Sequence, residues 1–248
     1  MILNVSFYRE GREIMRKFNF AVKFFIYMIY IAFRKLKYNI IKSKLNVRER
    51  ENYVFDVVNN WSKAIIKYSG LNIEVIGKEN LPNTTCLYVA NHQSQLDIPL
   101  IMANIDEVAG AIAKKEVGSW PIVSSWMKEF DCVFIDRENT REGLKSILQG
   151  VENLKKGRSM LIFPEGTRSK SHKINEFKKG SMKLATKAKV PIVPITVDGA
   201  FKGLEGTPED LKAKIIIHPC IKVDELTKEE ESNLAQICEE IISSSIKQ

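Results

Sequence analysis

The chain has 248 residues, enough to bury a hydrophobic core and suited to one domain with an appendage. Its hydrophobic content of 44% with 27% charged residues is typical of a globular protein and argues against disorder. The net charge of +8 lies at one end, because residues 1–50 hold 12 Lys/Arg against 3 Asp/Glu and the remaining residues hold 26 against 27. A neutral body is not expected to bind nucleic acid, so we expect the basic end to meet anionic lipid headgroups.

The first predicted element is an apolar helix flanked by basic residues. Residues 18–33 are apolar apart from Asn19 and Lys23, and a helix of this length is about 24 Å long. Crossing roughly 30 Å of hydrocarbon usually takes about 20 apolar residues. Because a span would separate the two basic flanks, a helix that lies in one leaflet fits better. We therefore predict a membrane-anchoring segment over residues 1–46. A single span and a helix buried in the protein are the alternatives.

The remaining residues, 47–248, are predicted to form one α/β domain. Apolar positions three or four apart predict a helix over residues 48–69 that ends at Gly70. Strand candidates such as 132–135 and 160–163 are apolar throughout, which predicts a mostly parallel central sheet flanked by helices. Ligands of such sheets bind at the carboxyl ends of the strands. Further strands are expected at 72–76, 86–90, 108–113, 192–197 and 214–217, and helices at 94–103, 140–155, 179–188 and 228–246.

The strongest candidate for chemistry follows the strand LYVA, where the chain reads NHQSQLD. This order of strand, turn and helix places His92 at a strand end and Asp97 in the first helical turn. A carboxylate there can orient the imidazole and stabilise the imidazolium that forms when His92 takes a proton. The alternative is structural, because Ser94 and Asp97 also have the spacing of a capping box. The other two histidines, His172 and His218, have no acidic residue at comparable spacing.

A second candidate is the segment FPEGTRS, residues 163–169, which again follows an apolar strand. The planar guanidinium of Arg168 suits a phosphate, and an ordinary solvated loop is the alternative. Arg137 and Lys114, each near the end of a predicted strand, could share that phosphate or form exposed ion pairs of little energetic value. The prolines of residues 190–195 are hard to place in a central strand. This segment could pack in the core or form a wall of an acyl pocket.

Several catalytic motifs are missing from the sequence. It has no GxSxG elbow, no GxxxxGK[ST] loop, no GxGxxG after a strand and no HExxH. A base without a protein nucleophile suits direct attack by a substrate hydroxyl on an activated acyl group. The four cysteines show no metal-ligand spacing, so we expect reduced thiols and neither a metal site nor a disulfide framework.

Taken in order, NHQSQLD, FIDR, FPEGTRS and VPIVPI resemble the four blocks of the glycerolipid acyltransferase family, and most of all its bacterial 1-acylglycerol-3-phosphate acyltransferases. The resemblance covers about residues 70–200. The second block reads DCVFIDR and lacks the glycine that often precedes this strand, and the long N-terminal extension is individual to this chain. Both departures bear on the identity of the acceptor and do not affect the proposed base, His92.

The resemblance implies transfer of a fatty acyl group from acyl-CoA or acyl-carrier protein to the sn-2 hydroxyl of lysophosphatidic acid, giving phosphatidic acid for phospholipid biosynthesis. It implies that His92 deprotonates the hydroxyl with support from Asp97. It further implies an enzyme without metal or other cofactor, at the cytoplasmic face of the cell membrane. The positions that match acceptor-binding residues of the family are Lys114, Arg137, Glu165, Gly166, Thr167 and Arg168.

Two alternatives stay open at this point. The acceptor could be glycerol-3-phosphate, another lysophospholipid or an aminolipid, since all of these need the same base. The chain could also be a non-catalytic lipid-binding protein on the same fold, although a binder has no need of the His92/Asp97 pair.

Overall fold

A computed structural model of the chain describes residues 2–136, 139–205 and 210–246. Its centre is one sheet, built from seven strands among these residues. The strands are β1 (Asn72–Ile76), β2 (Leu87–Ala90), β3 (Gly110–Lys114), β4 (Val133–Ile135), β5 (Met160–Ile162), β6 (Ile192–Asp198) and β7 (Lys212–Ile217). They lie in the order β1-β7-β6-β2-β5-β3-β4, and each neighbouring pair is parallel except β6 with β7.

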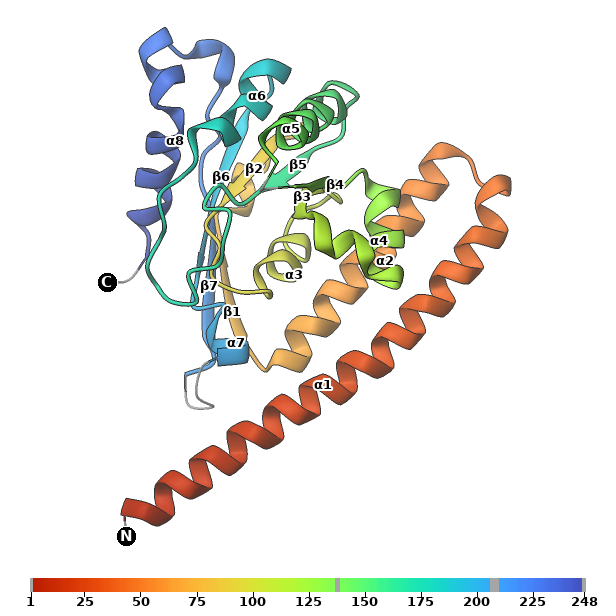
Figure 1. Cartoon of the computed structure of the whole chain (residues 1–248), viewed down its shortest axis with the longest axis vertical. Coiled ribbons are helices and arrows are strands. Elements are labelled where there is room, and N and C mark those ends of the chain that lie inside the picture. Colours follow the sequence, from red (N-terminus) through yellow and green to blue (C-terminus); the bar gives the residue numbers. More distant parts are fainter. Residues whose placement is uncertain (1, 137–138, 206–209, 247–248) are drawn as a thin grey trace.

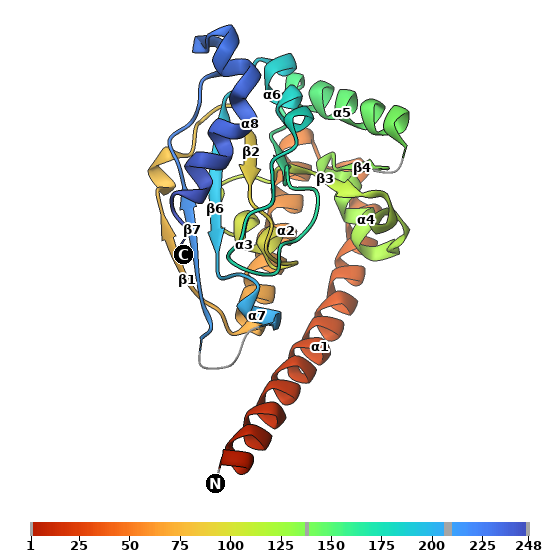
Figure 2. The same ribbon diagram turned by 60° about the vertical axis from the view of Figure 1, so that its left-hand side comes forward.

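The helices form a layer on each side of this sheet (Figures 1 and 2). They are α1 (Ile2–Ile41), α2 (Val47–Ser69), α3 (Asp97–Met102), α4 (Pro121–Met127), α5 (Thr140–Lys155), α6 (Lys183–Ala188), α7 (Lys202–Glu205) and α8 (Lys228–Ser243), with a 3-10 helix, η5 (Lys179–Met182), before α6. Buried side chains of α1 to α4 pack against one face of the sheet, and those of α5, α6 and α8 pack against the other. Strand β2 serves both layers, because Tyr88 faces the first and Val89 the second.

The local signals of the sequence explain the ends of the second helix. The side chain of Asn46 accepts a hydrogen bond from Glu49 N (3.0 Å), and the side chain of Glu49 accepts one from Asn46 N (2.8 Å). This capping box satisfies two backbone donors at the start of α2. The helix ends at Gly70, whose φ of 76° lies in the left-handed region that favours glycine.

The prediction of a mostly parallel sheet flanked by helices is confirmed. The helix over 140–155 begins and ends as predicted, whereas the helix expected at 94–103 begins only at Asp97. Two short helices, α4 and α7, were not predicted, although Pro121 at the first position of α4 is a typical helix start. The four cysteines are free, and Cys86, Cys132 and Cys238 are buried.

The expectation that prolines avoid a central strand is wrong for Pro194. This residue lies in β6, between β2 and β7, and pairs with Val89 of β2. The β6–β7 ladder begins only at Ile195, which pairs with Ile217, so the missing N–H of Pro194 removes no bond from that ladder. Its carbonyl still accepts a hydrogen bond from His218 N (3.0 Å).

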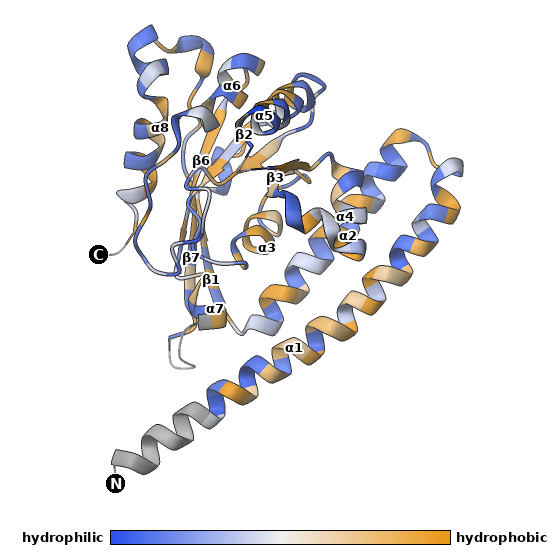
Figure 3. Ribbon diagram, viewed as in Figure 1, coloured by the Kyte–Doolittle hydropathy of each residue, from blue (hydrophilic) through white to orange (hydrophobic). Residues whose placement is uncertain are grey.

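Helix α1 packs only one side against the protein. Ile31 and Tyr38 are buried against the core, and the Trp126 ring N–H of α4 donates to the Ile31 carbonyl (3.2 Å). The opposite side carries exposed apolar residues along most of the described length (Figure 3). Among the described residues, none of the helices combines the length and the apolar character that crossing a bilayer requires.

Candidate active site

The candidate site lies where β2, β5 and β6 end at their carboxyl edge. The chain leaves β2 at Asn91, whose buried side chain continues the pairing with β6. Its Nδ2 donates to the Val197 carbonyl and its Oδ1 accepts from Val197 N, both at 2.8 Å. These two bonds fix the backbone position of the next residue, His92.

His92 and Asp97 form the pair that the sequence predicted. His92 Nδ1 lies 2.7 Å from Asp97 Oδ2, and the same oxygen accepts from Gln93 N (2.7 Å) and Ser94 N (2.8 Å). An ionised carboxylate can only accept, so Nδ1 carries the hydrogen and Nε2 is left as a proton acceptor. Half of the capping-box alternative is present, because Asp97 Oδ2 accepts from Ser94 N. The other half is absent, because Ser94 Oγ accepts from Leu96 N (3.3 Å) and α3 has no side-chain cap.

The two side chains differ in their exposure to solvent. The Asp97 side chain is 0% exposed, whereas 16% of the His92 side chain reaches solvent. Burial raises the pKa of Asp97, and the bonds from His92 and the two backbone N–H groups oppose this shift. The His92 ring also stacks on Phe163 with 4.2 Å between ring centroids. The imidazole is therefore held on one side by a buried carboxylate and on its face by an aromatic ring.

The segment 163–169 is joined to the His92 turn by backbone and side-chain bonds. Glu165, which is 4% exposed, accepts from His92 N (2.5 Å) through Oε1. Its Oε2 accepts from both the backbone N and the side-chain Nδ2 of Asn175, each at 2.8 Å. Ser169 N donates to the His92 carbonyl (2.8 Å). Burial raises the pKa of Glu165, opposed by these donors. Glu165 thus acts as an acceptor that connects two loops.

The backbone conformation of Gly166 favours glycine. Its φ is +70°, and a Cβ built there would lie 2.9 Å from Lys178 Nζ. The Lys178 side chain therefore runs over the turn, and Lys178 N also donates to the Pro164 carbonyl (3.1 Å). Among L-residues only glycine adopts this conformation routinely.

The other predicted binding residues are less closely gathered. Arg168 is half-buried one residue before Ser169, and Thr167 is exposed. Lys114 ends β3, two strands along from β2, and its exposed ammonium forms an ion pair with Glu116 (3.2 Å). Arg137 lies outside the described residues. The structure thus joins Glu165 to the His92 turn and does not connect Lys114 to it.

Three polar residues of this region were missed from the sequence. Gln93 Oε1 accepts from Gly199 N (2.8 Å), so this buried residue ties the His92 turn to the end of β6. His172 has an acidic partner after all, because its Nδ1 lies 2.5 Å from Asp198 Oδ1. Their separation of 26 residues explains why local spacing gave no sign of the pair.

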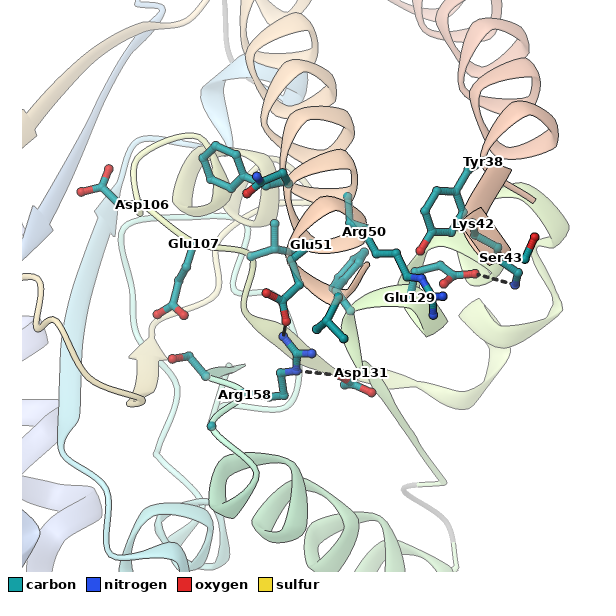
Figure 4. Close-up of a pocket in the computed structure, with 18 residues that line it drawn as sticks. Tyr38, Lys42, Ser43, Arg50, Glu51, Asp106, Glu107, Glu129, Asp131 and Arg158 are labelled. Atoms are coloured by element: carbon teal, nitrogen blue, oxygen red, sulfur yellow. Dashed lines mark hydrogen bonds and ion pairs between the residues drawn. The ribbon is translucent and has the colours of Figure 1, made fainter. Parts of the chain in front are cut away.

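A hollow of about 870 Å³ lies at the opposite edge of the sheet, near the amino ends of β3, β4 and β5 (Figure 4). Five of the charged residues that line it are paired with one another. Arg158 contacts Glu51 (2.5 Å) and Asp131 (3.5 Å), and Lys42 contacts Glu129 (3.8 Å). We assign it no chemistry. In the described ranges, no group of three or more His, Cys, Asp or Glu is arranged to hold a metal ion.

The chain is similar in sequence to several known acyltransferases. A probable 1-acyl-sn-glycerol-3-phosphate acyltransferase of Mycoplasma pneumoniae is 35% identical over 173 residues, 66% of this chain and 65% of that protein. The chloroplastic 1-acyl-sn-glycerol-3-phosphate acyltransferase LPAT1 of Arabidopsis thaliana is 35% identical over 196 residues, 75% of this chain and 54% of that protein. The chain thus spans less than two thirds of the length of these curated relatives.

The fold is also found in a solved structure. The crystal structure of the 1-acyl-sn-glycerophosphate (LPA) acyltransferase PlsC from Thermotoga maritima gives a TM-score of 0.80 at 27% identity, and the match covers 95% of both chains. A family model described as Acyltransferase matches residues 72–198, a range that holds the His92–Asp97 pair and the loop that braces it. Since this match spans about half of the chain and includes its candidate catalytic residues, the chain belongs to the acyltransferase family.

Proposed function

We propose that the chain is a 1-acyl-sn-glycerol-3-phosphate acyltransferase, which moves a fatty acyl group from a thioester to the sn-2 hydroxyl of 1-acylglycerol-3-phosphate and yields phosphatidic acid. The observation that carries this proposal is the 2.7 Å contact between His92 Nδ1 and the buried Asp97 carboxylate. The activities for which the relatives and the Thermotoga maritima enzyme are named agree with it.

The proposed reaction needs only these two side chains and the substrates. His92 Nε2 takes the proton of the acceptor hydroxyl as its oxygen attacks the thioester carbonyl. The tetrahedral intermediate then collapses, the carbon–sulfur bond breaks, and the thiolate receives the proton from the imidazolium. Asp97 stabilises the imidazolium between these two steps. The acyl donor is acyl-CoA or acyl-carrier protein, and no further cofactor takes part in this scheme.

The acceptor phosphate is proposed to bind beside the 163–169 loop. Arg168 supplies a planar fork for two phosphate oxygens, with Arg137 and Lys114 as further cationic partners. Glu165, Gly166 and Thr167 shape the loop, because Glu165 fixes it to His92 and Gly166 permits its turn.

The chain is further proposed to work at the cytoplasmic face of the cell membrane, with residues 1–46 as the anchor and 47–248 as the catalytic domain. Support comes from the apolar residues on the outer side of α1, such as Phe25 and Phe33, each 66% exposed. If this side of α1 is buried among the acyl chains of one leaflet, its apolar side chains are removed from water. The neighbouring basic residues would contact anionic headgroups.

The test is a kinetic comparison of two histidine variants. His92→Ala should lower kcat/KM for acylation of lysophosphatidic acid by about 10²–10⁴, with folding retained. His172→Ala removes the imidazole of the other His–Asp pair and should change the rate by only a few fold. A His92→Ala enzyme with the wild-type rate would exclude the mechanism. Glycerol-3-phosphate and other lysophospholipids, offered with the same donor, identify the acceptor.

A further inference from the structure

The side of α1 that faces the protein includes an arginine. Ile31 and Tyr38 are buried on this side, and Phe24 and Phe20 pack against the same core. Arg16 precedes Phe20 by four residues and is half-buried, so it lies on the same side of the helix. A guanidinium that is partly removed from water needs hydrogen-bond acceptors. The acceptor that Arg16 uses therefore shows how this part of α1 is joined to the protein.

Arg16 contacts helix α7 of the catalytic domain, which lies beside this part of α1 (Figures 1 and 2). Its Nη1 donates to the carbonyl of Gly203. The last carbonyls of a helix have no partner within the helix, so a side-chain donor stabilises the end of a short helix such as α7. The next cation along the chain differs, because the exposed ammonium of Lys17 pairs with Glu13 of α1 itself. Arg16 thus connects the N-terminal helix to the segment that follows β6.

Helix α7 packs directly on the turn that carries His92 and Asp97. Gly203 is buried, and a Cβ built at this position would overlap Leu96 Cδ1. Leu96 is 2% exposed and directly precedes Asp97. The backbone of α7 therefore touches the residue next to Asp97, with no room for a methyl group between them.

The same segment holds the other end of this turn. Gly199 N donates to Oε1 of the buried Gln93, the residue after His92 (2.8 Å). Helix α7 begins three residues after Gly199. The segment from Gly199 through α7 therefore contacts the turn at both ends, beside His92 and beside Asp97. A displacement of α7 would change the geometry of the contact between these two side chains.

We propose that Arg16 is a positioning residue for acyl transfer. By holding α7 against Leu96, it keeps the Asp97 carboxylate in place behind His92. This rests on the acyl transfer proposed above, and it gives α1 a second role besides the proposed membrane binding. Such a role matters for the rate, because a misplacement of about 1 Å caused far from the reacting atoms can lower a rate about a hundredfold. The N-terminal helix is then a part of the active-site architecture.

The test compares Arg16→Met with Lys17→Met in the full-length protein. Both variants remove one positive charge from the same turn of α1, but only the first removes the bond to α7. Lysophosphatidic acid and palmitoyl-CoA are supplied in mixed micelles of a non-ionic detergent, so that no bilayer is present. Arg16→Met should lose at least about tenfold in kcat and keep KM for both substrates within about twofold. Lys17→Met should match the wild type.

A conservative variant and hydrogen exchange separate positioning from a general loss of stability. Arg16→Lys can still donate to the Gly203 carbonyl, so its kcat should stay within about threefold of the wild type. The backbone N–H groups of Gln93 and Ser94 donate to Asp97. In Arg16→Met they should therefore exchange faster, while β2 keeps its protection. Faster exchange throughout the sheet together with a lower Tm would indicate a structural role alone and overturn the proposal.

The remaining outcomes are distinguishable. Arg16→Met with the wild-type kcat, with a change in KM alone, or with the same loss as Lys17→Met overturns the positioning role and leaves the acyl transfer standing. A wild type that acylates no acceptor refutes the acyl transfer and with it the proposal. If Arg16→Met does not fold, Gly203→Ala is measured, because its methyl group would displace Leu96 from the side of α7. A lower kcat with unchanged KM supports the role, and the wild-type kcat overturns it.

Discussion

Asp97 is the buried acid of the candidate active site, and its two oxygens are used unequally. Oδ2 accepts from His92 Nδ1, Gln93 N and Ser94 N, while Oδ1 has no hydrogen-bond partner among the described residues. Burying a charge with one oxygen unsatisfied is unfavourable for folding, which fits its raised pKa. The site therefore gives up some stability to place a carboxylate behind the base.

Replacing Asp97 with Asn tests the effect of the negative charge while keeping the hydrogen bonds that orient His92. The amide oxygen can take the place of Oδ2 and still accept from His92, Gln93 and Ser94, so the imidazole should keep its orientation. The negative charge that stabilises the imidazolium is lost. We expect kcat to fall by about 10²–10⁴ with little change in KM. Steady-state kinetics of the purified variant measure this, and an unchanged kcat would remove Asp97 from the mechanism.

The same variant predicts a pH dependence of stability. Because the pKa of Asp97 is raised in the folded state, that state binds more protons than the unfolded chain between about pH 3.9 and the raised pKa. The free energy of unfolding of the wild type should therefore fall, relative to Asp97→Asn, as the pH rises through this window. Urea unfolding of both proteins from pH 4 to pH 7 gives the difference. A wild type that gains stability relative to the variant would contradict the direction of the shift.

At the scale of elements, the site depends on two loops that are far apart in the sequence and lie side by side in the fold. The motif around His92 could be predicted because His92 and Asp97 are five residues apart and follow one strand. The bond from Glu165 to His92 N and the contact of His172 with Asp198 join different strand ends and leave no periodic signal. Residues 163–169 were recognised as a site loop, but the bracing role of Glu165 required the structure.

Glu165→Gln tests this connection between loops. The two carboxylate oxygens accept from His92 N and from Asn175, and an amide nitrogen cannot accept in place of either. One buried donor is then left unpaired, which should destabilise the fold by about 1–3 kcal/mol and loosen the His92 turn. We expect faster hydrogen exchange over residues 164–176 and a lower kcat. Glu176→Gln, an exposed neighbour, is the control and should change neither.

Asp131 follows the short 3-10 helix Lys128–Phe130 in a backbone conformation that favours glycine. Its φ of 57° lies in the left-handed region. Left-handed backbone is unfavourable for residues with a Cβ, although Asp tolerates it better than most. Asp131→Gly should therefore stabilise the fold by about 0.5–1 kcal/mol, or about 1–4 °C in Tm, even though it removes the exposed contact with Arg158. Asp106→Gly, at an exposed position without positive φ, should not stabilise the protein.

For the whole molecule, the sequence predicted the sheet and the N-terminal helix correctly but gave a simplified account of the charge. The strands that are apolar throughout lie inside a two-sided sheet, as their composition indicates. The N-terminal segment is longer than the apolar run, because α1 continues through the basic flanks on both sides. The neutral body divides into a basic segment, residues 168–189 with eight Lys/Arg against one Glu, and an acidic remainder once residues are counted by segment.

We predict that the side of α1 that faces away from the protein binds membranes. Phe18, Phe25 and Phe33 are 62%, 66% and 66% exposed and recur at seven- and eight-residue spacing, so they share one side of the helix. Replacing all three with Ser should leave Tm unchanged, because none contributes to the core. Binding to vesicles of phosphatidylglycerol and phosphatidylcholine should weaken at least about a hundredfold, since each buried Phe side chain contributes about 1.5–3 kcal/mol. Replacing Leu144 and Leu148 with Ser, which removes exposed apolar side chains from α5 on the other layer, should leave vesicle binding intact. If the triple variant co-sediments with vesicles as the wild type does, the outer side of α1 is not the membrane anchor.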